Sequence, residues 1–104
     1  MLLAIKKLLG LVPKVDYCEL IQQGAIVLDV RSKDEYSCGH IRNSINIPVE
    51  QLSNNLSKLK DKNKCIITCC ASGMRSASAN RILKSNGYLQ VYNGGGWYGL
   101  QNKL

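Results

Sequence analysis

The carboxyl-terminal part of the chain contains no acidic residue. All seven Asp and Glu residues of the 104-residue sequence occur at or before Asp61. Every charged side chain after Cys65 is basic, and these are Arg75, Arg81, Lys84 and Lys103. An enzyme that releases an alkoxide usually needs a carboxylic acid to protonate that leaving group. Only an upstream residue offers one here, and Asp29, at the end of an apolar run, is the best placed.

Histidine is almost absent, and the cysteines follow no common zinc-binding pattern. His40 is the single histidine, so any role for imidazole as a base or a metal ligand would fall on it. The spacing of Cys65, Cys69 and Cys70 fits no usual zinc site, and we predict neither a metal nor a cofactor. A disulfide between the adjacent Cys69 and Cys70 would close a strained ring. We therefore expect free thiols and a reducing, cytoplasmic location.

The chain has no hydrophobic run long enough to cross a bilayer. Residues 1–13 carry an apolar stripe that is broken by Lys6 and Lys7, so it is too short and too charged to span a membrane. We divide the chain into an amphipathic N-terminal segment, residues 1–14, and one domain, residues 15–104. We expect the segment to dock on the domain or to be disordered. Contact of residues 1–13 with a membrane surface is the alternative, which we do not favour.

Basic charge is in excess, but it lacks the features of a nucleic-acid site. The net charge is +7, and the densest basic run consists of Lys58, Lys60, Lys62 and Lys64. No aromatic residue is interleaved there for base stacking, and no known basic motif occurs. We predict a solvated surface without nucleic-acid binding, which steers small anions toward the site.

A cysteine pair stands between a predicted strand and a predicted helix. The segment Cys65-Ile66-Ile67-Thr68 is short and β-branched, as in a buried parallel strand, and Asn86-Gly87 is a helix stop signal. Open α/β sheets place their sites at the carboxyl ends of strands, where helix N-termini bind anions. The small residues of the octapeptide Cys69–Ser76 allow backbone N–H groups to surround a thiol and favour the thiolate. The sequence therefore predicts a cysteine nucleophile and an anionic substrate.

The loop can be counted in two ways, and each count indicates a different reaction. Counted from Cys70, four residues separate the cysteine from Arg75, and the loop resembles the six-residue active loop of the rhodanese sulfurtransferases. Counted from Cys69, five residues separate the cysteine from Arg75, and the loop resembles the phosphate loop of cysteine-dependent phosphatases. The loop alone leaves both interpretations open, although the missing acid argues against the phosphatase.

Motifs elsewhere in the chain resemble the rhodanese family and occur in the family's order. They cover about residues 15–101 and are Val27-Leu28-Asp29-Val30-Arg31, Asp34-Glu35-Tyr36, Gly39-His40-Ile41, Ser44-Ile45-Asn46-Ile47-Pro48 and Gly94-Gly95-Gly96-Trp97. The resemblance implies a three-layer α/β fold with a central parallel sheet of about five strands flanked by helices. Trp97 follows the glycines directly, where the family often has it about a turn later, so the lid over the site is expected to differ.

The resemblance also implies roles for individual residues. Cys70 is the implied nucleophile, and Cys69 is either an inert strand residue or a resolving thiol for a persulfide. Structural support is implied for His40 and for an ion pair between Asp29 and Arg31. The residues implied to bind substrate are Ala71, Ser72, Gly73, Met74, Arg75 and Ser76.

The expected activity is transfer of a sulfane sulfur through a Cys70 persulfide. The donor would be thiosulfate or another small anionic sulfur donor, and the acceptor would be cyanide, a thiol or a protein thiolate. Two other functions remain open at this point. A phosphatase or arsenate reductase would use Cys69, and a non-catalytic persulfide carrier or partner-binding module would accept sulfur but turn over slowly.

Alternating helix and strand signals predict a parallel sheet flanked by helices. Helices are expected to begin near Asp16, near Ser32 and near Pro48, and the helix that begins at Pro48 is expected to run to about Leu59. A further helix is expected after the cysteine loop, the name used here for the octapeptide Cys69–Ser76. A terminal turn or helix is expected from Trp97 to Leu100. Four strands are expected, over Ala25–Val30, Ser44–Ile47, Cys65–Cys69 and Leu89–Tyr92.

Overall fold

The computed structural model describes residues 14–104, so the expectations about residues 1–13 lie outside the described residues. Helices and strands alternate along the described chain. The helices are α2 (Tyr17–Gln22), α3 (Lys33–Ser37), α4 (Met74–Ser85) and α5 (Trp97–Gln101), with two 3-10 helices, η1 (Val49–Asn54) and η2 (Leu56–Lys58). The strands are β1 (Ile26–Asp29), β2 (Ile45–Asn46), β3 (Ile66–Cys70) and β4 (Val91–Gly96).

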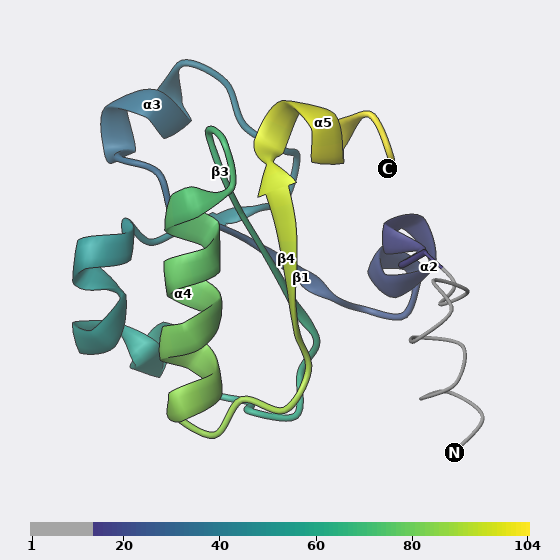
Figure 1. The fold of residues 1–104 in the computed structure, drawn as a ribbon. Helices are drawn as coiled ribbons and strands as arrows, with labels where there is room; N and C mark the ends of the chain where they lie inside the picture. Colours follow the sequence, from purple (N-terminus) through teal and green to yellow (C-terminus); the bar gives the residue numbers. More distant parts are fainter. Residues whose placement is uncertain (1–13) are drawn as a thin grey trace.

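The strands form one parallel sheet in the order β2-β1-β3-β4, with helices on both of its faces. Helix α4 and the 3-10 helices cover one face, and α2 and α5 cover the other (Figure 1). The loop between β3 and α4 lies between α3 and α5 at the carboxyl ends of the strands (Figure 1). The predicted three-layer α/β fold with a central parallel sheet is therefore confirmed.

The two faces of the sheet carry separate hydrophobic cores. Successive side chains of a strand point to opposite faces, so Ile66 and Cys70 of β3 pack with α4, whereas Ile67 and Cys69 pack with α2 and α5. The second core is the smaller one, because α2 and α5 are short helices.

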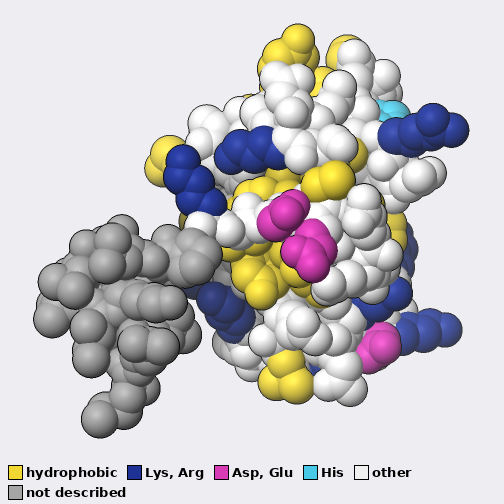
Figure 2. Space-filling view, turned by 90° about the vertical axis from the view of Figure 1, so that its right-hand side faces the viewer, with side chains coloured by type: hydrophobic (Ala, Val, Ile, Leu, Met, Phe, Trp, Pro, Cys, Tyr) yellow, Lys and Arg dark blue, Asp and Glu magenta, His cyan; other side chains and the backbone are white. Residues whose placement is uncertain are grey.

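On the molecular face shown in Figure 2, the Lys and Arg side chains are spread out rather than gathered in one band.

Residues 14–104 form a sheet of four strands, one fewer than the number of about five that the resemblance implied. The β2 edge is one at which the sheet cannot readily be extended. Strand β2 has only two residues, and Pro48 follows it closely. Proline has no N–H to donate to a further strand, so the edge stops there.

The expected helix from Pro48 to Leu59 is instead two 3-10 helices, η1 and η2. They are separated at Asn55, whose backbone has φ −129° and ψ 22°. The polar cluster of Ser53, Asn54 and Asn55 explains the break, because such side chains compete with the backbone for hydrogen bonds. Asn55 does so here, donating from Nδ2 to the carbonyl oxygen of Gln51 over 2.7 Å.

Two predicted helix starts are confirmed in detail. Asp16 caps α2 by accepting the N–H of Glu19 over 3.0 Å. Ser32 and Glu35 form a complete capping box at the start of α3, in which each side chain accepts the backbone N–H of the other residue. The capping box fixes Glu35 in the first turn of α3, next to the cysteine loop.

The glycine triplet belongs to strand β4, although the sequence predicted a strand that ended at Tyr92. Gly96 pairs with Cys70 across a β-bulge. A Cβ atom on Gly96 would lie 2.9 Å from the carbonyl oxygen of Ala71, in the cysteine loop. Glycine is therefore needed here because the two backbones approach closely.

No helix within residues 14–104 combines the length and the apolar character required to cross a bilayer.

Substituting two glycines tests the close approach of β4 to the loop. We expect Gly96→Ala to lower the free energy of unfolding by about 2 kcal/mol, because the added methyl would clash with a backbone oxygen and force β4 or the loop to shift. A Cβ atom on Gly99, in α5, would meet no other segment of the chain within 4 Å. Gly99→Ala is therefore the control and should be neutral or stabilise the protein by about 0.5 kcal/mol. Urea denaturation measures both, and equal effects would contradict this account.

Candidate active site

The cysteine loop is a short turn from the end of β3 to the start of α4. Cys70 is the last residue of β3, and Met74 is the first of α4. Between them, Gly73 occupies the N-cap position with φ 103°. This left-handed conformation favours glycine, and it turns the backbone so that the loop closes over the Cys70 side chain.

The Cys70 sulfur takes the place of a capping group at the N-terminus of α4. It accepts the backbone N–H of Gly73 over 2.9 Å and that of Ser76 over 3.3 Å. Gly73 has no side chain to perform this role, and α4 has no other side-chain cap. Two amide dipoles and the helix N-terminus therefore converge on one sulfur atom, which favours negative charge there.

Other N–H groups of the loop are free to bind an anion. Within residues 14–104, the backbone N–H groups of Ser72, Met74 and Arg75 have no protein acceptor. Ala71 and Ser72 are exposed, and Met74 is 80% exposed, whereas Cys70 is only 1% exposed. The loop thus has an accessible rim with unused donors, and its sulfur lies at the bottom.

Cys69 lies on the other face of the sheet from Cys70. It is fully buried in the core formed with α2 and α5. Burial raises the pKa of the Cys69 thiol to about 12, and the nearby carboxylate of Asp29 contributes in the same direction. All five cysteines are free thiols. The two adjacent thiols therefore have different environments, and only that of Cys70 is surrounded by loop N–H groups.

Arg75 is bound to a carboxylate rather than pointing free into the loop. Its Nη1 and Nη2 donate to the two carboxylate oxygens of Glu35 over 2.7 and 3.0 Å. This bidentate pair links α4 to α3, and together with the capping box it lowers the pKa of Glu35 to about 2. The guanidinium of Arg75, which the family resemblance implies to bind substrate, is thus occupied by Glu35.

The expected ion pair between Asp29 and Arg31 is present and buried. Arg31 Nη2 lies 2.7 Å from Asp29 Oδ2, and the exposed fractions of the two side chains are 5% and 1%. Arg31 also donates to the carbonyl oxygens of Glu35 and Gly39 over 3.3 and 2.7 Å. The Trp97 ring stacks on its guanidinium, with 4.6 Å from Arg31 Cζ to the ring centroid. The pair therefore joins β1 to α3 and to α5.

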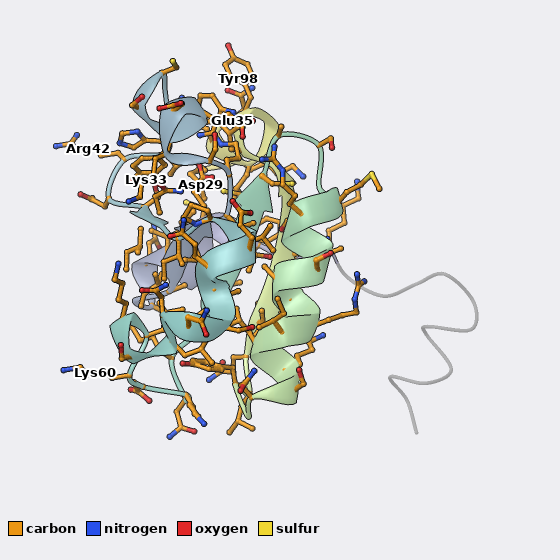
Figure 3. All side chains as sticks on the ribbon, turned by 90° about the vertical axis from the view of Figure 1, so that its left-hand side faces the viewer. Asp29, Lys33, Glu35, Arg42, Lys60 and Tyr98 are labelled. Atoms are coloured by element: carbon orange, nitrogen blue, oxygen red, sulfur yellow. The ribbon has the colours of Figure 1, made fainter. Side chains whose placement is uncertain are left out.

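His40 is held against α3, and Lys60 of the lysine run lies far from the loop. The His40 ring stacks on Tyr36 at 3.8 Å between centroids, and its Nδ1 is 2.7 Å from the Tyr36 carbonyl oxygen. These contacts hold it against α3. Lys60 lies at the end of the molecule opposite Glu35 and Tyr98 (Figure 3). Steering of small anions by the lysine run stays a prediction, and screening of exposed charges by salt weakens it over such a separation.

Three residues near the loop were missed as site residues. Glu35 was predicted only as part of a family motif near the start of a helix, and nothing in the sequence indicates its pairing with Arg75. The Ser76 hydroxyl contacts the other two, Thr68 on β3 and Asn93 on β4. The strand position of Thr68 beside the loop was a usable signal, whereas Asn93 lay outside the predicted strand.

Comparisons with known proteins agree with the motifs. The family described as the rhodanese-like domain matches residues 15–103. The thiosulfate sulfurtransferase PspE of Escherichia coli is 34% identical over 70 residues, which cover 66% of this chain and 67% of PspE. A solved structure, rhodanese with anions from E. coli, has a TM-score of 0.68 and 32% identity, covering 72% of this chain and 89% of that one. The chain belongs to the rhodanese-like domain family.

The same segment also occurs within longer proteins. A tRNA uridine(34) hydroxylase of Buchnera aphidicola is 37% identical over 78 residues, which cover 70% of this chain but only 25% of the hydroxylase. The chain thus spans a quarter of that relative, and the similarity concerns the shared domain alone.

Acid should weaken the contact between Glu35 and Arg75. The pKa of Glu35 is lowered in the folded protein, so its contribution to stability is complete above its unfolded pKa of 4.5 and is lost as the pH falls through about 2. Because the two side chains are 37% and 38% exposed, we expect Glu35→Gln to cost only about 0.5 kcal/mol at pH 7. The difference in unfolding free energy between wild type and variant, measured from pH 6 to pH 2, should shrink toward low pH. A difference that grows on acidification would contradict the pairing.

Proposed function

We propose that this protein is a sulfurtransferase that carries a sulfane sulfur on Cys70. The observation that supports it most directly is the position of the Cys70 sulfur, which accepts the N–H groups of Gly73 and Ser76 at the N-terminus of α4. A thiolate at this point is both stabilised and nucleophilic. The unused N–H groups on the loop can then hold the added sulfur or the anionic part of a donor.

The reaction proceeds by two displacements. The Cys70 thiolate attacks the outer sulfur of thiosulfate, an S–S bond forms, and the original sulfur–sulfur bond breaks, so that sulfite leaves with the electron pair. An acceptor such as cyanide, a thiolate or a protein thiolate then attacks the outer sulfur of the persulfide. Thiocyanate or a new persulfide leaves, and the Cys70 thiolate is restored. The electrons balance in both steps, so the reaction needs neither a metal nor a redox cofactor.

The burial of Cys70 favours a small donor with a terminal sulfur atom. Only 1% of the residue is exposed, so a donor must reach the sulfur past Ala71, Ser72 and Met74 on the rim. The terminal sulfur of thiosulfate is a single atom at the end of an anion and fits this approach. The similarity to PspE, a thiosulfate sulfurtransferase, supports the same donor.

The environment of Cys69 argues against a phosphatase or arsenate reductase that would use it as the nucleophile. Its thiol is buried, with a pKa of about 12, and so remains protonated at neutral pH. A phosphatase would also need an acid for the leaving group. Two carboxylates near the loop, those of Asp29 and Glu35, are each bound to an arginine and so are poorly placed to donate that proton. The same burial argues against Cys69 as a resolving thiol.

Substitution of each cysteine separates the two nucleophiles. We expect Cys70→Ser to lower thiosulfate:cyanide transfer by roughly a thousandfold or more, because the sulfur carrier is lost. Cys69→Ser is the matched control, one residue away, and should keep most of the activity. Thiocyanate formation measures both variants, and their melting temperatures show that each is folded.

Loss of activity in Cys69→Ser together with retained activity in Cys70→Ser would assign the nucleophile to Cys69 and would overturn the proposal. A wild-type protein that accepts sulfur on Cys70 but forms thiocyanate no faster than Cys70→Ser would instead be a sulfur carrier without turnover.

A further inference from the structure

The N–H of Ser76 reaches the Cys70 sulfur from within the first turn of α4, and its direction depends on how Ser76 is held. Ser76 is fully buried. Its hydroxyl does not face the loop. Instead, Ser76 Oγ lies 2.7 Å from Thr68 Oγ1 on β3 and 2.6 Å from Asn93 Oδ1 on β4. The side chain of Ser76 therefore anchors the first turn of α4 to two strands of the sheet.

The hydrogen bonds of Asn93 give this network a single direction. The N–H of Gly95 donates to Asn93 Oδ1 over 2.9 Å, which identifies that atom as the amide oxygen. An amide oxygen only accepts, so the Ser76 hydroxyl must donate its proton to it. Thr68 Oγ1 is then the donor in its contact with Ser76. Replacing Asn93 would release the Ser76 proton and remove the contact that draws this turn of α4 toward β4.

We propose that Asn93 is a positioning residue, which aims the Ser76 N–H at the Cys70 sulfur through the Ser76 hydroxyl. This inference rests on the proposed role of Cys70 as the nucleophile. Asn93 is well suited to the task, because it pairs in register with Thr68 and its own carbonyl oxygen accepts the hydroxyl of Tyr17 over 3.2 Å. Its position is thus set by the sheet and by α2, independently of the loop.

The fixed charges around the sulfur come from other elements and do not involve Asn93. Arg75 of α4 lies close enough to Cys70 to interact with it electrostatically and also interacts with Glu50 of η1, whereas the nearby Cys69 thiol in β3 is neutral. Arg75 is paired with Glu35 of α3, and Asp29 of β1 is paired with Arg31. Loss of the neutral Asn93 side chain leaves all of these charges in place. Loss of Asn93 also frees the N–H of Gly95, so comparison with the Ser76 variant is needed to show that a change in the reactivity of Cys70 reports the direction of the Ser76 N–H.

The test is the pH dependence of Cys70 alkylation by iodoacetamide, followed on the reduced protein by peptide-resolved mass spectrometry. The proteins are wild type, Asn93→Ala, Ser76→Ala and the double variant. We expect Asn93→Ala to slow alkylation at pH 7 by about fivefold and to move the midpoint of the pH profile upward, because one hydrogen bond to the thiolate is weakened. Ser76→Ala should have a similar effect, and the double variant should be no slower than the slower single variant.

Asn55→Ala is the control, because it removes a surface amide that bonds only Gln51 in the 3-10 region. It should leave the profile unchanged. A wild-type profile in Asn93→Ala, with an unchanged melting temperature, would overturn the inference. Independent, multiplicative effects in the double variant would also overturn it, since Asn93 would then act by another route. Alkylation of Cys70 requires no sulfur transfer. Failure of the proposed function would appear as the absence of a Cys70 persulfide after incubation with thiosulfate, which is a separate measurement.

Discussion

The buried ion pair between Asp29 and Arg31 is the interaction on which the arrangement of the site depends. The exposed fractions of its side chains are 1% and 5%, and breaking such a pair typically costs about 3–5 kcal/mol because a charge is left buried. The remaining donors of Arg31 hold the carbonyl oxygens of Glu35 and Gly39, and its guanidinium lies under Trp97. Through Glu35 the connection continues to Arg75 and the cysteine loop. The carboxyl end of the sheet is thus held by one continuous set of contacts.

Strand geometry explains why two adjacent cysteines are not equivalent. Side chains in β3 alternate between the faces of the sheet, so Cys70 meets the N-terminus of α4, whereas Cys69 enters the core beneath α2 and α5. One thiol therefore receives backbone N–H groups, and the other is desolvated beside a carboxylate. The difference in chemistry follows from the end of β3 at Cys70. A shift of the strand register by one residue would exchange the two environments.

Much of the fold and part of the site could be predicted from the sequence, because the signals were local. Helix caps such as Ser32 with Glu35, the apolar runs of the strands and the stop at Gly87 each depend on a few neighbouring residues. The missed features depend on contacts between distant segments. Gly96 belongs to a strand because β4 approaches Ala71, and Arg75 is bound to a residue 40 positions away. The network of Ser76, Thr68 and Asn93 likewise joins three elements, and no local pattern indicates it.

The central claim is that sulfur is carried on Cys70, and mass spectrometry of the protein after incubation with thiosulfate tests it most directly. The account predicts one added sulfur atom on the peptide with Cys69 and Cys70, located on Cys70 by fragmentation and by its loss in Cys70→Ser. Cyanide should remove that sulfur and form thiocyanate. Added sulfur on Cys69, or none on either cysteine in the folded and reduced protein, would contradict the account.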